Sequence, residues 1–224
     1  MTMPALLIFD CDGVLIDSEV IYARVGSRTL TAAGIPISEE EIIARFAGIP
    51  GSTVFAELQA EHGVTLTEEF FVQQSIELDR AFAEDLKAID GSAALLARLD
   101  RPKCVASSTG MARLTGCLEA TSLARYFDGK IYSAAMVEHG KPAPDLFLHA
   151  AREMGAEPPA CLVLEDSLAG VQAAVAAGMA VVGFTGASHL PPGHGDALKS
   201  AGAQSIIDRL DQFDEEIAAF AAPA

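Results

Sequence analysis

From residue 91 onward, short apolar segments alternate with segments that have the periodicity of amphipathic helices. This alternation is typical of a parallel sheet with helices on both faces. An apolar run at residues 5–9 must join the same sheet, because an isolated strand could not be stable. We therefore predict an α/β fold with strands at Ala5–Phe9, Lys103–Ser107, Lys130–Ser133, Cys161–Leu164, Met179–Phe184 and, more weakly, Ser205–Ile207.

Residues 17–88 interrupt this alternation, since they contain four helical segments and no convincing strand. In the last of these helices, Phe71, Leu78 and Phe82 fall on one face, and Thr65–Glu68 has the pattern of a capping box. We predict a core domain formed by residues 1–16 and 89–224 and a helical domain at residues 17–88. The helices are expected at about 18–33, 38–47, 53–61 and 65–85, with a turn at 48–51 and hinges near 15–18 and 88–91.

Composition limits the possible partners and the cellular location. The 224 residues carry a net charge of −16 and show no basic stripe, so a nucleic-acid partner is excluded. There is no polybasic segment and no apolar run long enough to cross a bilayer, so no membrane partner is expected. The cysteines form no CxxC pair, and we expect reduced thiols, a cytoplasmic protein and, from the acidic surface, a monomer.

Three predicted strands end in side chains that can carry out chemistry. Asp10 and Asp12 stand at the end of the first strand, Ser107-Ser108-Thr109 at the end of the second, and Glu165-Asp166 at the end of a later one. A loop adds Lys141. The carboxyl ends of parallel strands lie at the same edge of a sheet, and ligands bind in the crevice outside them. These groups are therefore expected to converge on one site.

The residue types indicate what such a site would bind. Asp10 and Asp12 repel each other unless a cation or a proton lies between them, so the pair is either a metal site or an acid/base pair. Carboxylates from two strands suit a hard cation, and Mg²⁺ is the natural candidate. Hydroxyls, a lysine and helix N-termini suit a phosphate. Together these groups indicate phosphoryl transfer to Asp10, because an aspartate can act as a covalent nucleophile.

Each of these features also has a plainer interpretation. The sequence Asp-x-Asp-Gly is common in turns, and Lys141 could be one of the many solvated lysines. Ser107 and Ser108 could cap the helix that follows, which is compatible with phosphate binding because both use the same place. The acidic pair Glu165-Asp166 could simply be favoured by the dipole of the next helix.

Four motifs in order resemble those of the haloacid dehalogenase (HAD) superfamily. They are Asp10-x-Asp12-Gly13-Val14, Ser107, Lys141-Pro142 and Glu165-Asp166-Ser167. The helical insert after the first motif resembles the C1-type cap of the branch that contains phosphoglycolate phosphatase and β-phosphoglucomutase. The resemblance covers nearly the whole chain and implies a Rossmann-like parallel core with an inserted cap domain.

The resemblance also implies roles for individual residues. Asp10 would be the nucleophile and a metal ligand, and Asp12 the general acid and base, with its backbone carbonyl on the metal. Asp166 would bind Mg²⁺, with Glu165 as a second ligand or as a partner of the ligands. Ser107 and Lys141 would hold the phosphoryl group, helped by backbone amides near Cys11, Asp12 and Ser108.

The implied activity is the hydrolysis of a small phosphomonoester, a sugar phosphate or a phosphorylated organic acid such as 6-phosphogluconate or phosphoglycolate. The dehalogenases of the superfamily lack the aspartate found here at Asp12. The histidine and arginine of the mutases would fall at Tyr22 and near Gly51, which argues against a sugar phosphomutase. That mutase and a non-enzymatic binder of a phosphometabolite remain the alternatives.

The other polar residues receive no role from the sequence. The five histidines, His62, His139, His149, His189 and His194, show no spacing typical of metal ligands, and we expect most of them at the surface. Residues 189–195 have the composition of a loop. Arg24 and Arg45 lie on predicted helices of the insert and are expected to face solvent rather than a substrate anion.

Overall fold

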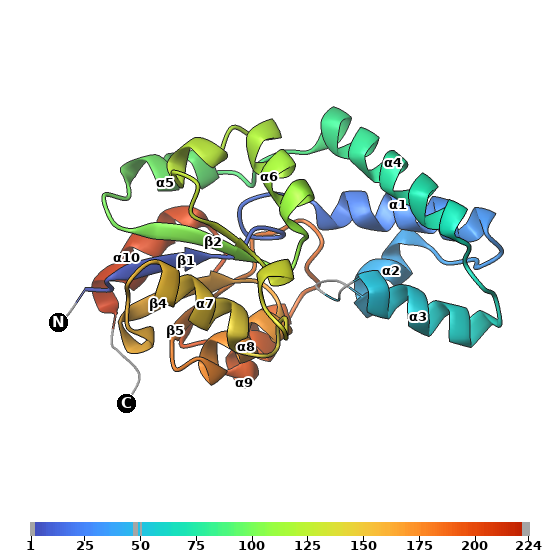
Figure 1. Ribbon diagram of the computed structural model, residues 1–224. Coiled ribbons are helices and arrows are strands. Elements are labelled where there is room, and N and C mark those ends of the chain that lie inside the picture. Colours follow the sequence, from blue (N-terminus) through green and yellow to red (C-terminus); the bar gives the residue numbers. More distant parts are fainter. Residues whose placement is uncertain (1–2, 47–48, 50, 221–224) are drawn as a thin grey trace.

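The computed structural model describes residues 3–46, 49 and 51–220, and it contains one parallel sheet of six strands (Figure 1). The strand order is β3-β2-β1-β4-β5-β6. All six predicted strands are confirmed, with ends that differ from the prediction by at most one residue. The strands are β1 (Leu6–Phe9), β2 (Lys103–Ser107), β3 (Ile131–Ser133), β4 (Cys161–Glu165), β5 (Ala180–Phe184) and β6 (Ser205–Ile207).

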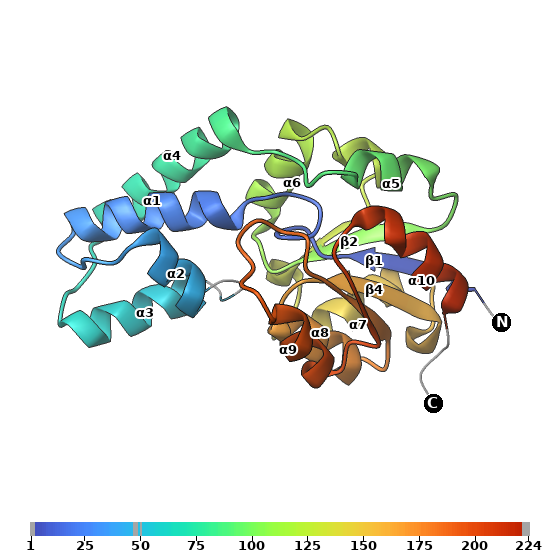
Figure 2. The same cartoon turned by 180° about the vertical axis from the view of Figure 1, so that it is seen from behind.

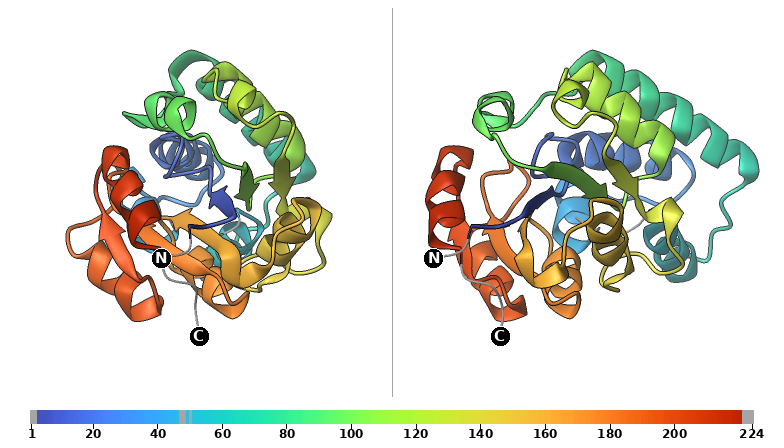
Figure 3. Two further views of the ribbon diagram at one scale, coloured as in Figure 1. Left: turned by 90° about the vertical axis from the view of Figure 1, so that its left-hand side faces the viewer. Right: turned by 60° about the vertical axis from the view of Figure 1, so that its left-hand side comes forward.

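Helices cover both faces of the sheet, as Figure 3 shows from two directions. Alternate strand residues point to opposite faces, so Leu7 and Phe9 pack against one helical layer and Leu6 and Ile8 against the other. The first layer consists of α5 (Ser92–Arg98), α6 (Met111–Ala120) and α10 (Phe213–Ala219), and the second of α7 (Asp145–Glu153), α8 (Leu168–Ala176) and α9 (His194–Ala201). Burial on both faces explains why the strands are almost wholly apolar.

Strand β1 lies at the centre of the sheet, between β2 and β4. The chain places β2 and β3 on one side of β1 and then returns to place β4, β5 and β6 on the other. The order therefore reverses next to β1, and such a switch point opens a crevice at the carboxyl ends of the strands. The sequence places Asp10 at this position.

Four helices extend beyond the carboxyl end of the sheet, coloured blue to teal in Figure 1. They are α1 (Glu19–Ala32), α2 (Glu39–Phe46), α3 (Gly51–His62) and α4 (Glu68–Asp85). They share a small core of their own, formed by Leu30, Ile35, Ile37, Phe46, Leu58 and Leu66. The division into domains at residues 17–88 stays a prediction, as do the hinges.

Two details of α4 differ from the prediction. Its N-cap is Thr67, whose hydroxyl accepts a hydrogen bond from the amide of Phe70, and not Thr65. Leu78 and Phe82 are buried, but Phe71 is 40% exposed and packs edge-on against Phe55. Phe71 lies in the first turn of α4, which packs beside Phe55 of α3, whereas Leu78 and Phe82 belong to the main core.

The two chain segments that lead into and out of the four helices lie side by side. The amide of Asp17 donates to the carbonyl of Lys87 at 3.0 Å, and the amide of Ile89 donates to the carbonyl of Leu15 at 2.9 Å. Ile16 and Ala88 form an antiparallel bridge between them. The predicted hinge segments are therefore paired with each other through backbone hydrogen bonds.

Parts of the predicted turn at 48–51 lie outside the described residues, because Gly48 and Pro50 are not described. Among the helices of the described part of the chain, none has the length and apolar character needed to span a bilayer.

Candidate active site

The loop after β1 is held in place by backbone hydrogen bonds. The amide of Asp10 donates to the carbonyl of Leu164 on β4 at 3.0 Å, which extends the sheet by one residue. The amide of Leu15 donates to the carbonyl of Cys11 at 2.9 Å, which closes a turn in the chain. Gly13 adopts φ +78°, and a Cβ there would lie 1.9 Å from Oδ2 of Asp166. Glycine is required at this position both for the left-handed backbone and for the close approach of Asp166.

Lys141 joins the ends of β1 and β4. Its Nζ donates to Oδ1 of Asp10 at 2.6 Å and to Oε2 of Glu165 at 3.0 Å. All three side chains are buried, with at most 9% of any of them exposed. The alternative that Lys141 is a solvated lysine is therefore wrong.

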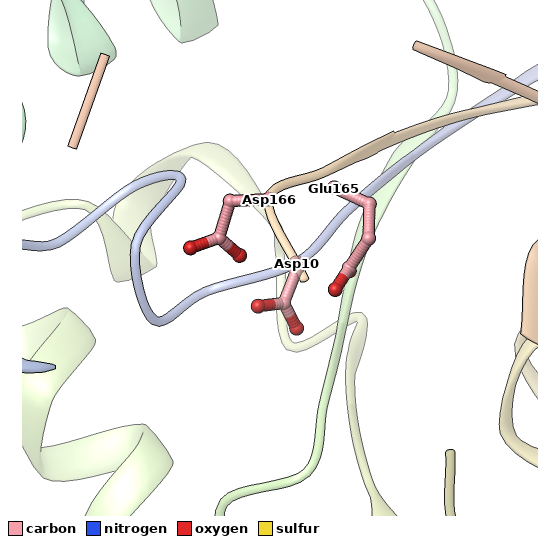
Figure 4. Close-up of side chains that lie close together, drawn as sticks. All are labelled: Asp10, Glu165 and Asp166. Atoms are coloured by element: carbon pink, nitrogen blue, oxygen red, sulfur yellow. The ribbon is translucent and has the colours of Figure 1, made fainter. Parts of the chain in front are cut away.

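Three carboxyl groups meet beside this lysine. Asp10, Glu165 and Asp166 each offer an oxygen, and these oxygens lie within 4.8 Å of one another (Figure 4). Burial raises the pKa of Asp10 and of Asp166 well above the ordinary value, and the charge of Glu165 raises the pKa of both further. Lys141 opposes this effect, but it supplies one positive charge for three carboxylates.

The donor set fits a divalent cation. Among the described residues, Lys141 is the one lysine or arginine bonded to the cluster, which leaves two negative charges uncompensated when all three carboxylates are ionised. Oxygen-only ligands and a charge deficit of two suit a hard divalent cation better than a soft metal. The cluster could therefore hold such an ion.

Glu165 is held at both of its oxygens. Oε2 accepts from Lys141, and Oε1 accepts from the hydroxyl of Ser167. The Ser167 hydroxyl also accepts the amide of Gly170 at 3.0 Å and so caps α8. A Cβ on Gly170 would lie 1.9 Å from Oε1 of Glu165, so the helix can begin against this carboxylate only with glycine at that position.

The side chain of Asp12 lies apart from the carboxylate cluster and is bonded to hydroxyl groups instead. Ser18 donates to Oδ1 at 2.6 Å, while Ser107 and Thr109 donate to Oδ2 at 3.1 and 2.8 Å. These donors come from the start of the helical insert and from the end of β2. They fix the orientation of the Asp12 carboxylate next to the Asp10 site.

The two serines after β2 differ in their environment. Ser107 is buried and bonds to Asp12, whereas Ser108 is exposed. The expectation that they cap α6 is wrong, because the N-cap is Gly110 and no side chain caps that helix. The Ser107 hydroxyl instead accepts the amide of Thr109 at 3.0 Å, which closes the turn before Gly110.

The structure corrects the expectation for two histidines. His189 is buried, and its Nε2 lies 3.5 Å from Oδ2 of Asp166. Its pKa falls to about 4 because burial disfavours the charged ring. His194 lies at the start of α9, inside the segment expected to be a loop, and its Nε2 lies 2.6 Å from the carbonyl oxygen of Asp166.

Sequence reasoning placed Thr109 among the reactive side chains at the end of the second strand but gave it no role, and it missed Ser18 and His189 as site residues. The sequence holds no signal for Ser18 and His189, because their contacts depend on how the helical insert and the β5–α9 connection fold back over the site.

Arg24 and Arg45 do not point free cationic groups at the site. Arg24 pairs with Asp85 and is about half exposed. Arg45 pairs with three carboxylates of the insert, those of Glu41, Glu57 and Glu61. The expectation that they are surface residues holds, with acidic neighbours as their partners.

Comparison with known proteins places this geometry in a family. A family model described as haloacid dehalogenase-like hydrolase matches residues 4–178. A 6-phosphogluconate phosphatase from Escherichia coli (strain K12) is 36% identical over 186 residues, covering 82% of this chain and 84% of that protein. A fructose-1-phosphate phosphatase from the same strain is 32% identical over 180 residues, covering 79% and 94%.

A solved structure shows the same fold. It is a conserved haloacid dehalogenase-like protein of unknown function from Agrobacterium tumefaciens, with a TM-score of 0.85 and 44% identity, covering 96% of this chain and 98% of that one. The family match spans β1, β2 and β4, whose ends carry Asp10, Ser107 and the acidic pair. The chain therefore belongs to the haloacid dehalogenase-like hydrolases and is an enzyme of the phosphatase kind found among its relatives.

Proposed function

We propose that this enzyme is a Mg²⁺-dependent phosphatase that hydrolyses a small phosphomonoester through an aspartyl-phosphate on Asp10. One observation carries the proposal: the buried Asp10 carboxylate, bonded to Lys141, belongs to the carboxylate cluster at the strand end, two residues before the hydroxyl-bound Asp12. A nucleophile, a cation site and a separate acid/base group are thus present in one crevice.

In the first half-reaction, a carboxylate oxygen of Asp10 attacks phosphorus while the bond from phosphorus to the ester oxygen breaks. The leaving alcohol needs a proton, and Asp12 in its protonated form supplies it. Ser18, Ser107 and Thr109 hold the Asp12 carboxyl group in place for this transfer. The products are the free alcohol and phosphorylated Asp10.

In the second half-reaction, the Asp12 carboxylate takes a proton from water, and the water oxygen attacks the phosphorus of phosphorylated Asp10. The bond between phosphorus and the Asp10 oxygen breaks, which releases inorganic phosphate and restores both aspartates. Asp12 thus ends each cycle protonated and ready for the next substrate.

Asp10, Asp166, Glu165 and the backbone carbonyl of Asp12 would hold the Mg²⁺ ion. The ion would supply positive charge that offsets the repulsion between Asp10 and the phosphoryl oxygens. Lys141 supports the same site with a permanent charge, and its bond to Glu165 holds it in reach of Asp10. Ser107, Ser108 and the amides of Cys11 and Asp12 would bind the phosphoryl oxygens.

The substrate is proposed to be a sugar phosphate or a phosphorylated organic acid such as 6-phosphogluconate or phosphoglycolate. The names of two relatives, a 6-phosphogluconate phosphatase and a fructose-1-phosphate phosphatase, support substrates of this size. Helices α1–α4 would act as a cap that closes over the substrate and excludes bulk water. A cytoplasmic location and a monomeric state complete the proposal and rest on composition alone.

A sugar phosphomutase is the rival activity. Its histidine and arginine would fall at Tyr22 and near Gly51 in this chain. Tyr22 packs edge-on against Phe82 with ring centres 5.1 Å apart, and Gly51 begins α3. Neither position offers the ionisable group that the resemblance associates with mutases. A non-enzymatic binder is disfavoured because Asp10, Asp12 and Lys141 are all present.

The test is phosphate release from a panel that contains 6-phosphogluconate, fructose 1-phosphate, phosphoglycolate and an aryl phosphate. The wild type is assayed with Mg²⁺ and with EDTA, beside Asp10→Asn and the exposed control Asp100→Asn. Release that needs Mg²⁺, disappears in Asp10→Asn and persists in Asp100→Asn supports the proposal. Glucose phosphate isomers are assayed beside this panel, and their interconversion without phosphate release would replace the proposal with the mutase.

A further inference from the structure

Two histidines approach the same acidic residue, His189 from the connection between β5 and α9 and His194 from the first residue of α9. His189 places Nε2 3.5 Å from the Oδ2 atom of Asp166, and His194 places Nε2 2.6 Å from the backbone carbonyl of Asp166. The backbone carbonyl of Asp166 can only accept, so His194 must present an N–H there; a carboxylate that is ionised, as a metal ligand is, likewise accepts an N–H from His189. Asp166 is therefore contacted at its side chain and at its backbone by one segment.

His189 is a buried polar residue with an unsatisfied atom. Its side chain is 2% exposed, and its Nδ1 has no hydrogen-bond partner among the described residues. A buried nitrogen without a partner is unfavourable, and an apolar side chain would fill the same space without that cost. The contact made by the other nitrogen, Nε2, is the feature that distinguishes histidine here.

The connection that carries His189 is held against the start of the helical insert. The hydroxyl of Ser188 donates to the Asp17 carboxylate at 2.9 Å. Figure 2 shows this connection rising from α9 toward the beginning of α1. Two contacts thus hold the segment on either side of the His189 imidazole: the hydrogen bond from Ser188 to Asp17 and the contact of His194 with the Asp166 carbonyl.

The contact with His189 involves one of the two oxygens of Asp166. Oδ2 faces His189 and lies over Gly13, close enough that a Cβ on Gly13 would meet it at 1.9 Å and His189 Cε1 at 3.0 Å. Asp166 is also a member of the carboxylate cluster with Asp10 and Glu165. An imidazole that donates to Oδ2 leaves Oδ1 for a cation.

We propose that His189 is a positioning residue that donates Nε2–H to Oδ2 of Asp166 and so orients the carboxylate toward the cation site. Partners of this kind fix the geometry of a metal ligand without touching the metal. The inference rests on the proposed function, because it requires that the cluster binds Mg²⁺.

The test measures Mg²⁺ binding to the metal-free enzyme by calorimetry, without substrate. His189→Leu removes the donor and keeps an apolar volume, while His189→Gln restores an N–H at the position of Nε2. His189→Asn places its amide at the position of Nδ1, and His62→Leu changes an exposed histidine at the end of α3.

The Mg²⁺ Kd is expected to rise about tenfold or more in His189→Leu and His189→Asn. In His189→Gln and His62→Leu the Mg²⁺ Kd is expected to stay near that of the wild type. If His189→Leu does not fold, the comparison of His189→Gln with His189→Asn still tests the proposal. Equal Kd values for Gln and Asn would overturn the proposal.

The outcome for the wild type separates this proposal from the preceding one. If the wild type hydrolyses phosphomonoesters with Mg²⁺ but the Kd is the same in every variant, only the role of His189 fails. If the wild type binds no Mg²⁺, the metal part of the proposed function fails and the role of His189 fails with it.

Discussion

Replacing Lys141 by methionine should destabilise the metal-free enzyme severely. Lys141 is buried and donates to Asp10 at 2.6 Å and to Glu165 at 3.0 Å. Methionine has a similar shape, so the main change is the loss of charge beside two buried carboxylates. Removing one partner of a buried ion pair costs about 3–5 kcal/mol, because it leaves an uncompensated charge. For a protein of this size, the expected fall in Tm is roughly 6–20 °C.

Urea and thermal unfolding in EDTA measure this loss, with the exposed Lys130→Met as the matched control. The control should change the free energy of unfolding by less than about 0.5 kcal/mol. Adding Glu165→Gln to Lys141→Met removes one of the stranded charges and should restore part of the stability. Saturating Mg²⁺ should reduce the difference from wild type. A loss below about 1 kcal/mol in EDTA would refute the reasoning that Lys141 neutralises a buried acidic pair.

Three further predictions follow from the same site. The metal-free wild type should gain stability as pH falls toward the raised pKa of Asp10 and Asp166, because these two carboxyl groups bind protons in the folded state at pH values where they are ionised in the unfolded chain; His189, whose pKa falls to about 4, opposes the trend below its ordinary pKa of 6.5. Mg²⁺ should weaken or reverse the trend, and a metal-free Tm that rises as pH rises above about 7 would contradict it. Gly170→Ala should lower the free energy of unfolding by about 1–3 kcal/mol, because the new Cβ would overlap Glu165. The control Gly116→Ala in α6, where a Cβ would have no neighbour within 4 Å, should not lower it, and equal effects of the two substitutions would argue against the overlap. Thr109→Val should reduce kcat with little change in Mg²⁺ affinity, because it removes one hydroxyl donor to Asp12 and leaves the carboxylate cluster intact. The control Thr115→Val should leave kcat and Mg²⁺ affinity unchanged, and an equal loss of kcat in the two variants would show that Thr109 has no specific role.

The sheet was predictable because each strand is a short apolar run between helical segments. Burial on both faces leaves a strand such as Leu6–Phe9 with no polar residue, which marks it as a central strand but leaves its register against β2 and β4 unspecified by the sequence. The acidic and hydroxyl residues at the strand ends were predictable for the same reason, since the topology of a parallel sheet brings those ends together.

The capping of α4 and α6 was harder to predict. Both Thr65 and Thr67 precede α4, and only the backbone path selects Thr67 as its N-cap. After β2, Ser107 turns to Asp12 and leaves Gly110 as the N-cap of α6. Local propensity identifies the residue type at a helix start, but tertiary contacts decide which residue is used.

The surroundings of the site were not predictable from the sequence. Ser18 meets Asp12 only because the insert begins beside the β1 loop, and His189 is buried only because a long connection returns over Asp166. Both contacts join segments that are far apart in the chain or in irregular structure, where periodicity carries no information.

The central claim is that Asp10 carries the phosphoryl group, and an acid-quenched reaction of Asp12→Asn with an aryl phosphate tests it most directly. An aryl leaving group needs little protonation, so the first half-reaction should proceed, while the second should stall without the Asp12 base. Mass spectrometry of the digested protein should then find one phosphoryl group on the peptide that contains Asp10 and none in Asp10→Asn/Asp12→Asn. Phosphate release without phosphorylation of Asp10, or phosphorylation of another residue, would contradict the account.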